Sequence, residues 1–294
     1  MSHPRKWRES ARGPIIVATV IVSCVTLGFA VVFPGIKEAG PKDILFLAEA
    51  ACSGAAIVLL VIVYQVDPGV IRPKSVKDEE VTKAEHGQTA NLSKDEKGQW
   101  CRKRTLADGK VEIYERYCGT CHIWRPPRAS HCNVCGYCMQ RFDHHCTALG
   151  TCIARKNHRF FVAFLVSVSL GALFLLTGAI FSLKDIEWGT VRAWRDWHMY
   201  VIIILALVYL YVSLIAWFAA AHIFLLLCDL TTKQYLKSDP EAVFLTGRPD
   251  CQRFFGNLRS VCCANIKWKY LSGKPVFTDP SVSVGNAVAP APPV

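Results

Sequence analysis

Four consecutive residues, Asp143, His144, His145 and Cys146, have the side chains that nucleophilic chemistry requires. A neutral imidazole beside a thiol can accept its proton, and a carboxylate can hold that imidazole in the right tautomer. The thiolate that results is the reactive form of cysteine. We therefore predict that Cys146 is a nucleophile, served by a neighbouring histidine and by Asp143.

The residues around these four are typical of zinc ligands. A structural zinc ion takes four Cys or His ligands, and two cysteines separated by two residues supply a pair of them. Two such sites need eight ligands, which six cysteines and two histidines supply, so that one cysteine is left over. We expect Cys146 to be that cysteine, the alternative being that it is an additional zinc ligand. The stretch contains Cys118, Cys121, His122, His131, Cys132, Cys135, Cys138, His144, His145, Cys146 and Cys152.

The whole pattern resembles the signature of the DHHC family of protein S-acyltransferases, or palmitoyltransferases. Outside the cysteine-rich stretch, Asp67-Pro68-Gly69 resembles the family's DPG motif, and Thr231-Thr232 resembles the start of its TTxE motif. Residues 117–128 and 141–142 are similar to the subgroup that acylates Ras-type proteins. The residues that carry the resemblance at matching spacings are Cys118, Cys121, His131, Cys132, Cys135, Cys138, Asp143, His144, His145, Cys146, Cys152, Asn157 and Phe161.

The resemblance implies a role for each of these residues. His144 would be the base, Asp143 its orienting partner and His145 a zinc ligand. Ligand types alone leave an iron–sulfur cluster open, although two interleaved sets of three cysteines and one histidine favour zinc. One structural zinc would be held by Cys118, Cys121, His131 and Cys138, and the other by Cys132, Cys135, His145 and Cys152.

The resemblance also implies a reaction in two steps. Cys146 would take the acyl group of palmitoyl-CoA as a thioester, and the group would then pass to a cysteine thiol of a membrane-associated protein. Arg155, Lys156 and Arg159 lie near a membrane boundary and are candidates for binding the CoA phosphates. The alternative is that they are ordinary cationic anchors of a membrane protein. Members of the Ras-acylating subgroup can require a small accessory subunit, which joins the expected partners.

The chain departs from the family pattern at several positions. Thr147 and Ala148 follow the nucleophile where the family commonly has Pro and Trp, His158 replaces a Tyr, and Gln234 replaces the Glu of the TTxE motif. These changes leave open a second function, that of a catalytically inactive, zinc-stabilised membrane adaptor. A transporter or channel is less well supported. Ion pathways usually place polar residues within the spans, and the apolar runs of this chain are nearly free of charged residues.

The composition is that of a membrane protein. Of the 294 residues, 52% are hydrophobic and 19% are charged, and the hydrophobic residues gather in runs long enough to cross a bilayer. Glu49 is the only acid within the second run, and we expect it at the membrane interface. We find no internal repeat. The runs expected to span are 15–33, 44–66, 160–183 and 199–227.

The distribution of positive charge predicts an orientation. Of the 34 Lys and Arg residues, 29 fall in the N-terminal segment, the large central loop and the tail, and five fall in the two short loops. Because positive residues stay on the cytosolic side, both termini and the cysteine-rich domain are expected in the cytosol. CxxC pairs also fit a reducing compartment. The net charge of +11 is then explained by contact with a membrane surface and not with nucleic acid. We expect that membrane to belong to the endomembrane system (Golgi or ER) or to be the plasma membrane.

The predicted fold class is an all-α integral membrane protein with four transmembrane helices. A small cytosolic, zinc-stabilised β-hairpin domain is inserted between the second and third helices. Within that loop, residues 72–98 are rich in Lys, Glu and Asp and are expected to be a flexible linker. The expected parts are a cytosolic N-terminus (1–14), helices one and two (15–66), a cytosolic loop (67–159) with the DHHC domain at about 114–159, helices three and four (160–227) and a cytosolic tail (228–294).

Overall fold

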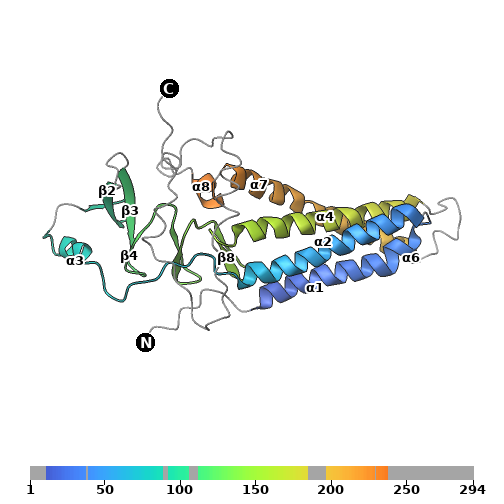
Figure 1. The fold of residues 1–294 in the computed structure, drawn as a ribbon, viewed down its shortest axis with the longest axis horizontal. Helices are drawn as coiled ribbons and strands as arrows, with labels where there is room; N and C mark the ends of the chain where they lie inside the picture. The colour runs from blue at the N-terminus through green and yellow to red at the C-terminus, as the bar shows by residue number, and fades with distance from the viewer. Residues whose placement is uncertain are drawn as a thin grey trace, which may run out of the picture. The chain divides into compact units, whose positions relative to one another are not determined.

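The computed structural model describes residues 11–37, 39–88, 92–105, 112–184, 197–228 and 230–237. The chain divides into two compact units (Figure 1). The helical unit comprises residues 11–64 and 159–224, and the cysteine-rich unit comprises the described residues of 65–158 and 225–237. The first ten residues of the expected N-terminus and the expected tail beyond residue 237 lie outside the described residues.

Four helical stretches among the described residues are long and apolar enough to cross a membrane: Arg12–Gly35, Gly40–Gln65, His158–Lys184 and Met199–Leu227. A bilayer core about 30 Å thick needs about 20 apolar residues in a helix. The predicted membrane fold is therefore confirmed. The helical elements are α1 (Arg12–Leu27), a π-helical turn η1 (Gly28–Val32), a 3₁₀ turn η2 (Phe33–Gly35), α2 (Ala39–Gln65), α4 (His158–Lys184), α6 (Trp197–Ser213) and α7 (Ile215–Leu227).

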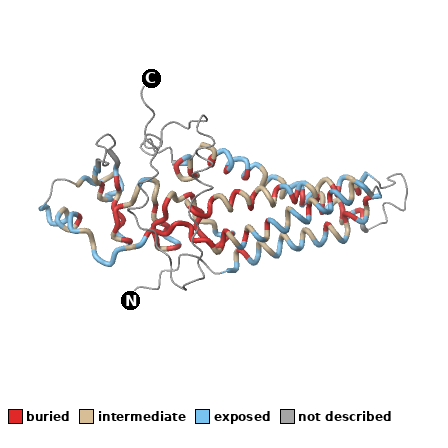
Figure 2. Tube along the Cα trace, in the orientation of Figure 1, coloured by how far each residue is buried: buried red, intermediate tan, exposed pale blue. Residues whose placement is uncertain are grey.

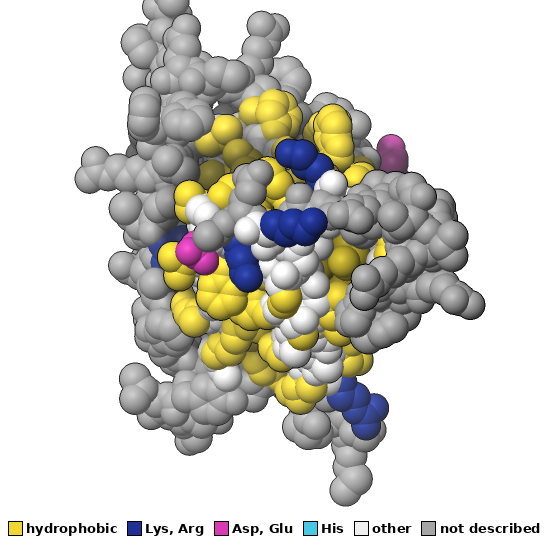
Figure 3. Space-filling view, turned by 90° about the vertical axis from the view of Figure 1, so that its right-hand side faces the viewer, with side chains coloured by type: hydrophobic (Ala, Val, Ile, Leu, Met, Phe, Trp, Pro, Cys, Tyr) yellow, Lys and Arg dark blue, Asp and Glu magenta, His cyan; other side chains and the backbone are white. Residues whose placement is uncertain are grey.

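Glycines allow close approach between helices of the helical unit. A Cβ added to Gly28 would lie 2.3 Å from Leu175 Cδ2, and one added to Gly171 of α4 would lie 3.4 Å from Ser53 Oγ of α2. Small residues are the usual means of packing helices in lipid, where burial of apolar surface gives little driving force. Exposed residues recur along α1 and α2 in Figure 2. In the view of Figure 3, hydrophobic side chains make up much of the described surface.

Two details of the spans were not predicted from the sequence. Glu49 has no exposed surface and accepts a hydrogen bond from Ser53 one turn later on α2, and its place at the membrane interface stays a prediction. The fourth span lies where it was expected, but its helix breaks at Leu214 between α6 and α7. Ser213 Oγ donates to the Leu210 carbonyl at 2.7 Å, and such back-bonding by a serine often bends a helix.

The cysteine-rich unit contains the small β-rich region that the sequence predicts between the second and third spans. β1 to β4 form one antiparallel sheet, β5 pairs with β6, and β7 pairs with β8. A short helix, α8 (Thr232–Lys237), follows the last span. The strands are β1 (Ser93–Lys94), β2 (Trp100–Thr105), β3 (Glu112–Cys118), β4 (Ile123–Arg125), β5 (Ser130–Cys132), β6 (Tyr137–Met139), β7 (His144–Cys146) and β8 (Thr151–Ile153).

The prediction of a flexible linker at 72–98 is wrong for part of that range, which contains α3 (Glu79–Glu85) and β1. Asp78 caps α3 by accepting from the Glu80 N–H at 3.2 Å. Acids in the first turn and Lys83 in the last turn complement the helix dipole. Val81 is fully buried in a cluster with Tyr117 and Trp124. The charged composition of this segment therefore did not indicate the capped helix α3, which Val81 anchors by its burial.

Candidate active site and metal centres

Three hairpins of the cysteine-rich unit have the same design. Each has a cysteine as the last residue of its first strand, paired with the first residue of the second strand: Cys118 with Ile123, Cys132 with Tyr137 and Cys146 with Thr151. In each, the residue just after the CxxC-like segment has a positive φ, namely 53° at His122, 74° at Gly136 and 58° at Gly150. The paired cysteines recur every 14 residues. The expectation of no internal repeat is therefore wrong.

The repeat explains how two metal sites interleave. In the first two hairpins, a second cysteine follows three residues after the paired one, as Cys121 and Cys135. The second and third hairpins each contribute a histidine just before the paired cysteine and a cysteine in the middle of the second strand. Each site thus takes two ligands from one hairpin and two from the next. The resulting groups are Cys118, Cys121, His131 and Cys138, hereafter cluster one, and Cys132, Cys135, His145 and Cys152, hereafter cluster two.

The distances within both clusters fit tetrahedral zinc. Tetrahedral bonds of about 2.3 Å to sulfur and about 2.0–2.1 Å to nitrogen place sulfur and nitrogen roughly 3.5 Å apart. His131 Nδ1 lies 3.5, 3.4 and 3.8 Å from the sulfurs of cluster one. His145 Nδ1 lies 3.7, 3.5 and 3.5 Å from those of cluster two. The two clusters therefore fit two structural zinc ions. The individual ligand roles predicted from the sequence stay predictions, with the residues grouped as the resemblance implied.

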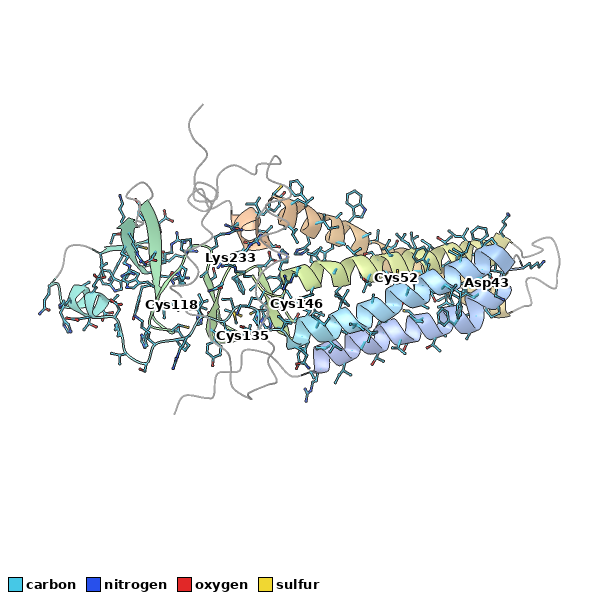
Figure 4. All side chains as sticks on the ribbon, in the orientation of Figure 1. Asp43, Cys52, Cys118, Cys135, Cys146 and Lys233 are labelled. Carbon is cyan, nitrogen blue, oxygen red and sulfur yellow. The ribbon has the colours of Figure 1, made fainter. Side chains whose placement is uncertain are left out.

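Cys146 belongs to neither cluster. It occupies the position of Cys118 and Cys132 in the repeat, but Leu149 stands where Cys121 and Cys135 provide the second thiol. No fourth hairpin that could complete a third site follows directly, because α4 begins at His158. Cys146 is half-buried, whereas the six clustered cysteines are buried. Figure 4 labels it together with Cys118 and Cys135.

His144 connects Cys146 to Asp143. Its Nδ1 lies 2.6 Å from Asp143 Oδ2, and interaction with the Cys146 side chain helps to raise the pKa of the same ring. A histidine whose Nδ1 proton is held by a carboxylate presents Nε2 as the acceptor. The structure thus brings together the three residues predicted to react, in the order that proton transfer from the thiol requires.

The surroundings of His144 and Asp143 favour the charged form of both side chains. Burial lowers the pKa of His144, but the hydrogen bonds to Asp143 and Cys146 outweigh it and raise the pKa to about 9. Burial would raise the pKa of Asp143, yet His144, His158 and the Thr232 N–H hold it well below its usual range. Asp143 is 2% exposed. Near neutral pH the site therefore favours an imidazolium at His144 beside a carboxylate at Asp143.

Asp143 is fixed in place from a distant part of the chain. Thr232 donates to it twice, from its backbone N–H to Oδ1 at 2.7 Å and from its hydroxyl to Oδ2 at 2.9 Å. Asp143 and His158 also have ligand atoms within 4.8 Å of each other. The sequence prediction missed both contacts. The resemblance of Thr231-Thr232 to a motif was the one available signal for Thr232.

A capping box positions Thr232 at the start of α8. The Thr231 N–H donates to Gln234 Oε1 at 3.0 Å, and the Gln234 N–H donates to Thr231 Oγ1 at 3.2 Å. Gln serves this motif as Glu does, which accounts for the departure at position 234. Lys233, labelled in Figure 4, donates to Ser130 of β5, so α8 contacts both the second hairpin and the residue preceding the third.

The three cations predicted to bind CoA have different surroundings. Lys156 is 6% exposed, and its ammonium donates to Asp67 at 2.8 Å. Asp67 also accepts from the Gly69 and Val70 N–H groups, so this pair anchors the Asp67-Pro68-Gly69 turn. Arg155 is half-buried in the same unit. Arg159, in the helical unit, lies over the Phe160 ring at 4.7 Å. Binding of CoA by these residues stays a prediction.

Comparison with known proteins gives consistent matches. Residues 111–239 match the family model described as DHHC palmitoyltransferase. The chain is 29% identical to protein S-acyltransferase 8 of Arabidopsis thaliana, over 72% of this chain and 52% of that protein. It is 42% identical to palmitoyltransferase ERF2 of Eremothecium gossypii, over 45% of this chain and 34% of that protein. It is 30% identical to human palmitoyltransferase ZDHHC9, over 50% and 40%. The matched segments span between about a third and a half of these relatives' lengths.

Proposed function

We propose that this chain, whose residues 111–239 match the family model described as DHHC palmitoyltransferase, is a protein S-acyltransferase. It moves a palmitoyl or similar long-chain acyl group from acyl-CoA to cysteine thiols of membrane-associated proteins. The observation that carries the proposal is a half-buried thiol outside two complete metal clusters, joined through His144 to a buried carboxylate. An inactive adaptor would need the clusters but not this connection.

The first step forms a thioester on Cys146. His144 holds the proton taken from the thiol, and the thiolate attacks the carbonyl carbon of the acyl-CoA thioester. The new bond joins Cys146 Sγ to that carbon, and the bond from the carbon to the CoA sulfur breaks. The CoA thiolate leaves with the proton from His144. Asp143 keeps the imidazole oriented and its charge balanced throughout.

The second step reverses these roles. A thiol of the acceptor protein enters, His144 takes its proton, and the acceptor thiolate attacks the acyl carbon held by Cys146. The acyl group passes to the acceptor, and Cys146 regains its proton from His144. Splitting one transfer into two easier ones is the usual advantage of a covalent intermediate. The zinc ions, held by the eight clustered residues, would fix the hairpins and take no part in the transfer.

Several finer parts of the proposal follow from the sequence. Both termini and the DHHC domain face the cytosol, because 29 of the 34 Lys and Arg residues fall in the N-terminal segment, the central loop and the tail, and positive residues stay on the cytosolic side. The membrane belongs to the endomembrane system or the plasma membrane. Acceptors have membrane-proximal cysteines and include Ras-type proteins, and a small accessory subunit assists. CoA phosphates meet Arg155 and Arg159, while Lys156 holds Asp67.

The proposal is tested by labelling the purified chain with an alkyne analogue of palmitoyl-CoA. We expect a hydroxylamine-labile label on the wild type, absent from Cys146→Ser and unchanged in Cys101→Ser, which alters a free cysteine outside both clusters. His144→Ala should lose most of the label with its zinc content unchanged. Equal labelling of wild type and Cys146→Ser would overturn the assignment, and an unlabelled wild type would favour the inactive adaptor.

A further inference from the structure

The hydroxyl of Thr151 is buried and has no hydrogen-bond partner among the described residues. Thr151 has no exposed surface, and its Oγ1 is left unpaired. Buried hydroxyls normally have partners, because leaving one unpaired costs free energy. An unpaired donor is expected where its partner arrives only with the reacting substrate, as in sites that stabilise a developing negative charge.

The register of the third hairpin places this hydroxyl beside the nucleophile. Thr151 lies directly opposite Cys146 in the antiparallel pair β7–β8. Side chains of directly opposite residues project from the same face, with Cβ atoms about 4.5–5.5 Å apart. The carbonyl oxygen of an acyl group on Cys146 Sγ lies two bonds from the sulfur. A hydroxyl on the opposite residue can therefore reach that oxygen at the about 2.7–3.1 Å that such donors need.

The other two hairpins lack this arrangement. The residues equivalent to Thr151 are Ile123 and Tyr137, opposite Cys118 and Cys132. Those cysteines are members of the metal clusters and meet no carbonyl group. A small hydroxyl side chain opposite the paired cysteine is thus confined to the hairpin whose cysteine is not in a cluster.

We propose that Thr151 Oγ1 donates a hydrogen bond to the acyl carbonyl oxygen as that oxygen becomes negative, making Thr151 a further catalytic residue. This role rests on the proposed acyl transfer. When the Cys146 thiolate attacks, the carbonyl π electrons move to oxygen, and the Thr151 hydroxyl pairs with the oxyanion. The carbonyl re-forms as the bond to the CoA sulfur breaks and His144 protonates that sulfur. The same hydroxyl serves the second step, in which an oxyanion forms at the same carbon.

The test compares two reactions of Cys146, only one of which passes through an oxyanion. Acylation by palmitoyl-CoA forms one, whereas alkylation by iodoacetamide displaces iodide at a saturated carbon and does not. In Thr151→Val, which keeps the shape and removes the hydroxyl, we expect acylation to slow by about 10²-fold with alkylation and zinc content unchanged. Thr151→Ser should restore acylation to within a few-fold of the wild type.

Thr147→Val is the matched control, because it makes the same chemical change on an exposed residue of the same turn. It should leave both rates unchanged. Wild-type acylation rates in Thr151→Val would overturn the proposal. A parallel fall in acylation and alkylation would also overturn it, since the residue would then act on the thiolate and not on the oxyanion. An unlabelled wild type that still alkylates would refute the acyl transfer itself and this role with it.

Discussion

The second and third hairpins of the cysteine-rich unit have the same turn, but their paired cysteines have different roles. In β5–β6 the paired cysteine, Cys132, is joined by Cys135 in a metal cluster. In β7–β8 the paired cysteine, Cys146, is followed at the same spacing by Leu149, which is 2% exposed. One leucine in place of a thiol thus removes a metal-binding pair and leaves a cysteine available for reaction.

The residues before each hairpin differ in a matching way. His131 and His145 occupy equivalent positions and both lie in metal clusters. One step earlier, the second hairpin has Ser130 and the third has His144. Two positions before His131 and His145, the second hairpin has Ala129 and the third has Asp143, which supplies the carboxylate. A metal-binding repeat therefore supplies the geometry, and substitutions at three positions convert its last copy into a candidate active site.

The largest expected effect on activity is the loss of cluster two, which we compare with the loss of cluster one. Cys152→Ala in cluster two should remove one zinc and reduce self-acylation below detection, because a structural zinc contributes about 10–16 kcal/mol to folding and His145 of that cluster directly precedes Cys146. Elemental analysis and acyl labelling measure both. Cys118→Ala should also remove one zinc but retain measurable acylation, since cluster one has no ligand in the third hairpin. Equal activity loss in both variants would break the distinction between the hairpins.

Asp143→Asn should slow self-acylation by about 10²-fold or more, because the base loses the group that orients it. The variant also changes the pH profile. With the pKa of His144 raised to about 9, the imidazolium that protonates the leaving sulfur persists to about that pH, and acylation should fall above it. Without the carboxylate that raises this pKa, the alkaline fall should move to lower pH. An unmoved alkaline limb would contradict the role given to Asp143.

Leu149→Cys restores the missing thiol of the third hairpin. Cys146 and the new cysteine would form a CxxC pair, so excess zinc should slow acylation by about tenfold, because a metal-bound thiolate cannot act as the free nucleophile. A chelator should reverse the effect, and the wild type should not respond to added zinc. Leu149→Val, which adds no ligand, is the control. Zinc sensitivity equal to that of the wild type would count against the equivalence of the turns.

Thr232→Val should have the smallest effect, about three- to tenfold on acylation, because it removes one of two hydrogen bonds to a charged group. Lys233→Ala removes the contact of α8 with the second hairpin and should change the rate less. The pH profile distinguishes positioning from general stability, since only Thr232→Val should shift the alkaline limb. A larger effect from Lys233→Ala would reverse the assignment of α8 to the third hairpin.

Much of the fold and site could be predicted because the signals are local in sequence. Continuous apolar runs predict spans, and cysteine spacing indicates ligands, since a tetrahedral metal accepts few spacings. The 14-residue repeat was present in the positions of Cys118, Cys132 and Cys146 but escaped notice, because the intervening residues share little beyond turn chemistry. The even spacing of the cysteines was the signal that would have found it.

The remaining features depend on tertiary contacts. Thr232 lies 89 positions from the carboxylate it holds, and nothing local to either residue predicts their meeting. Lys156 has the composition of a surface cation, yet its partner Asp67 makes it a buried one. The burial of Glu49 likewise follows from the approach of α4 at Gly171. Side-chain partners across such sequence separations are set by packing, which a single sequence does not specify.

The central claim is that eight residues form two metal clusters and that Cys146, which belongs to neither, carries the acyl group. Native mass spectrometry of the detergent-solubilised chain after incubation with palmitoyl-CoA tests this in a single measurement, with peptide mapping to locate the acyl group. We expect one species that carries two zinc ions and one palmitoyl group together, with the group on Cys146. Acylated molecules that have lost a zinc ion, or an acyl group located on a residue of either cluster, would contradict it.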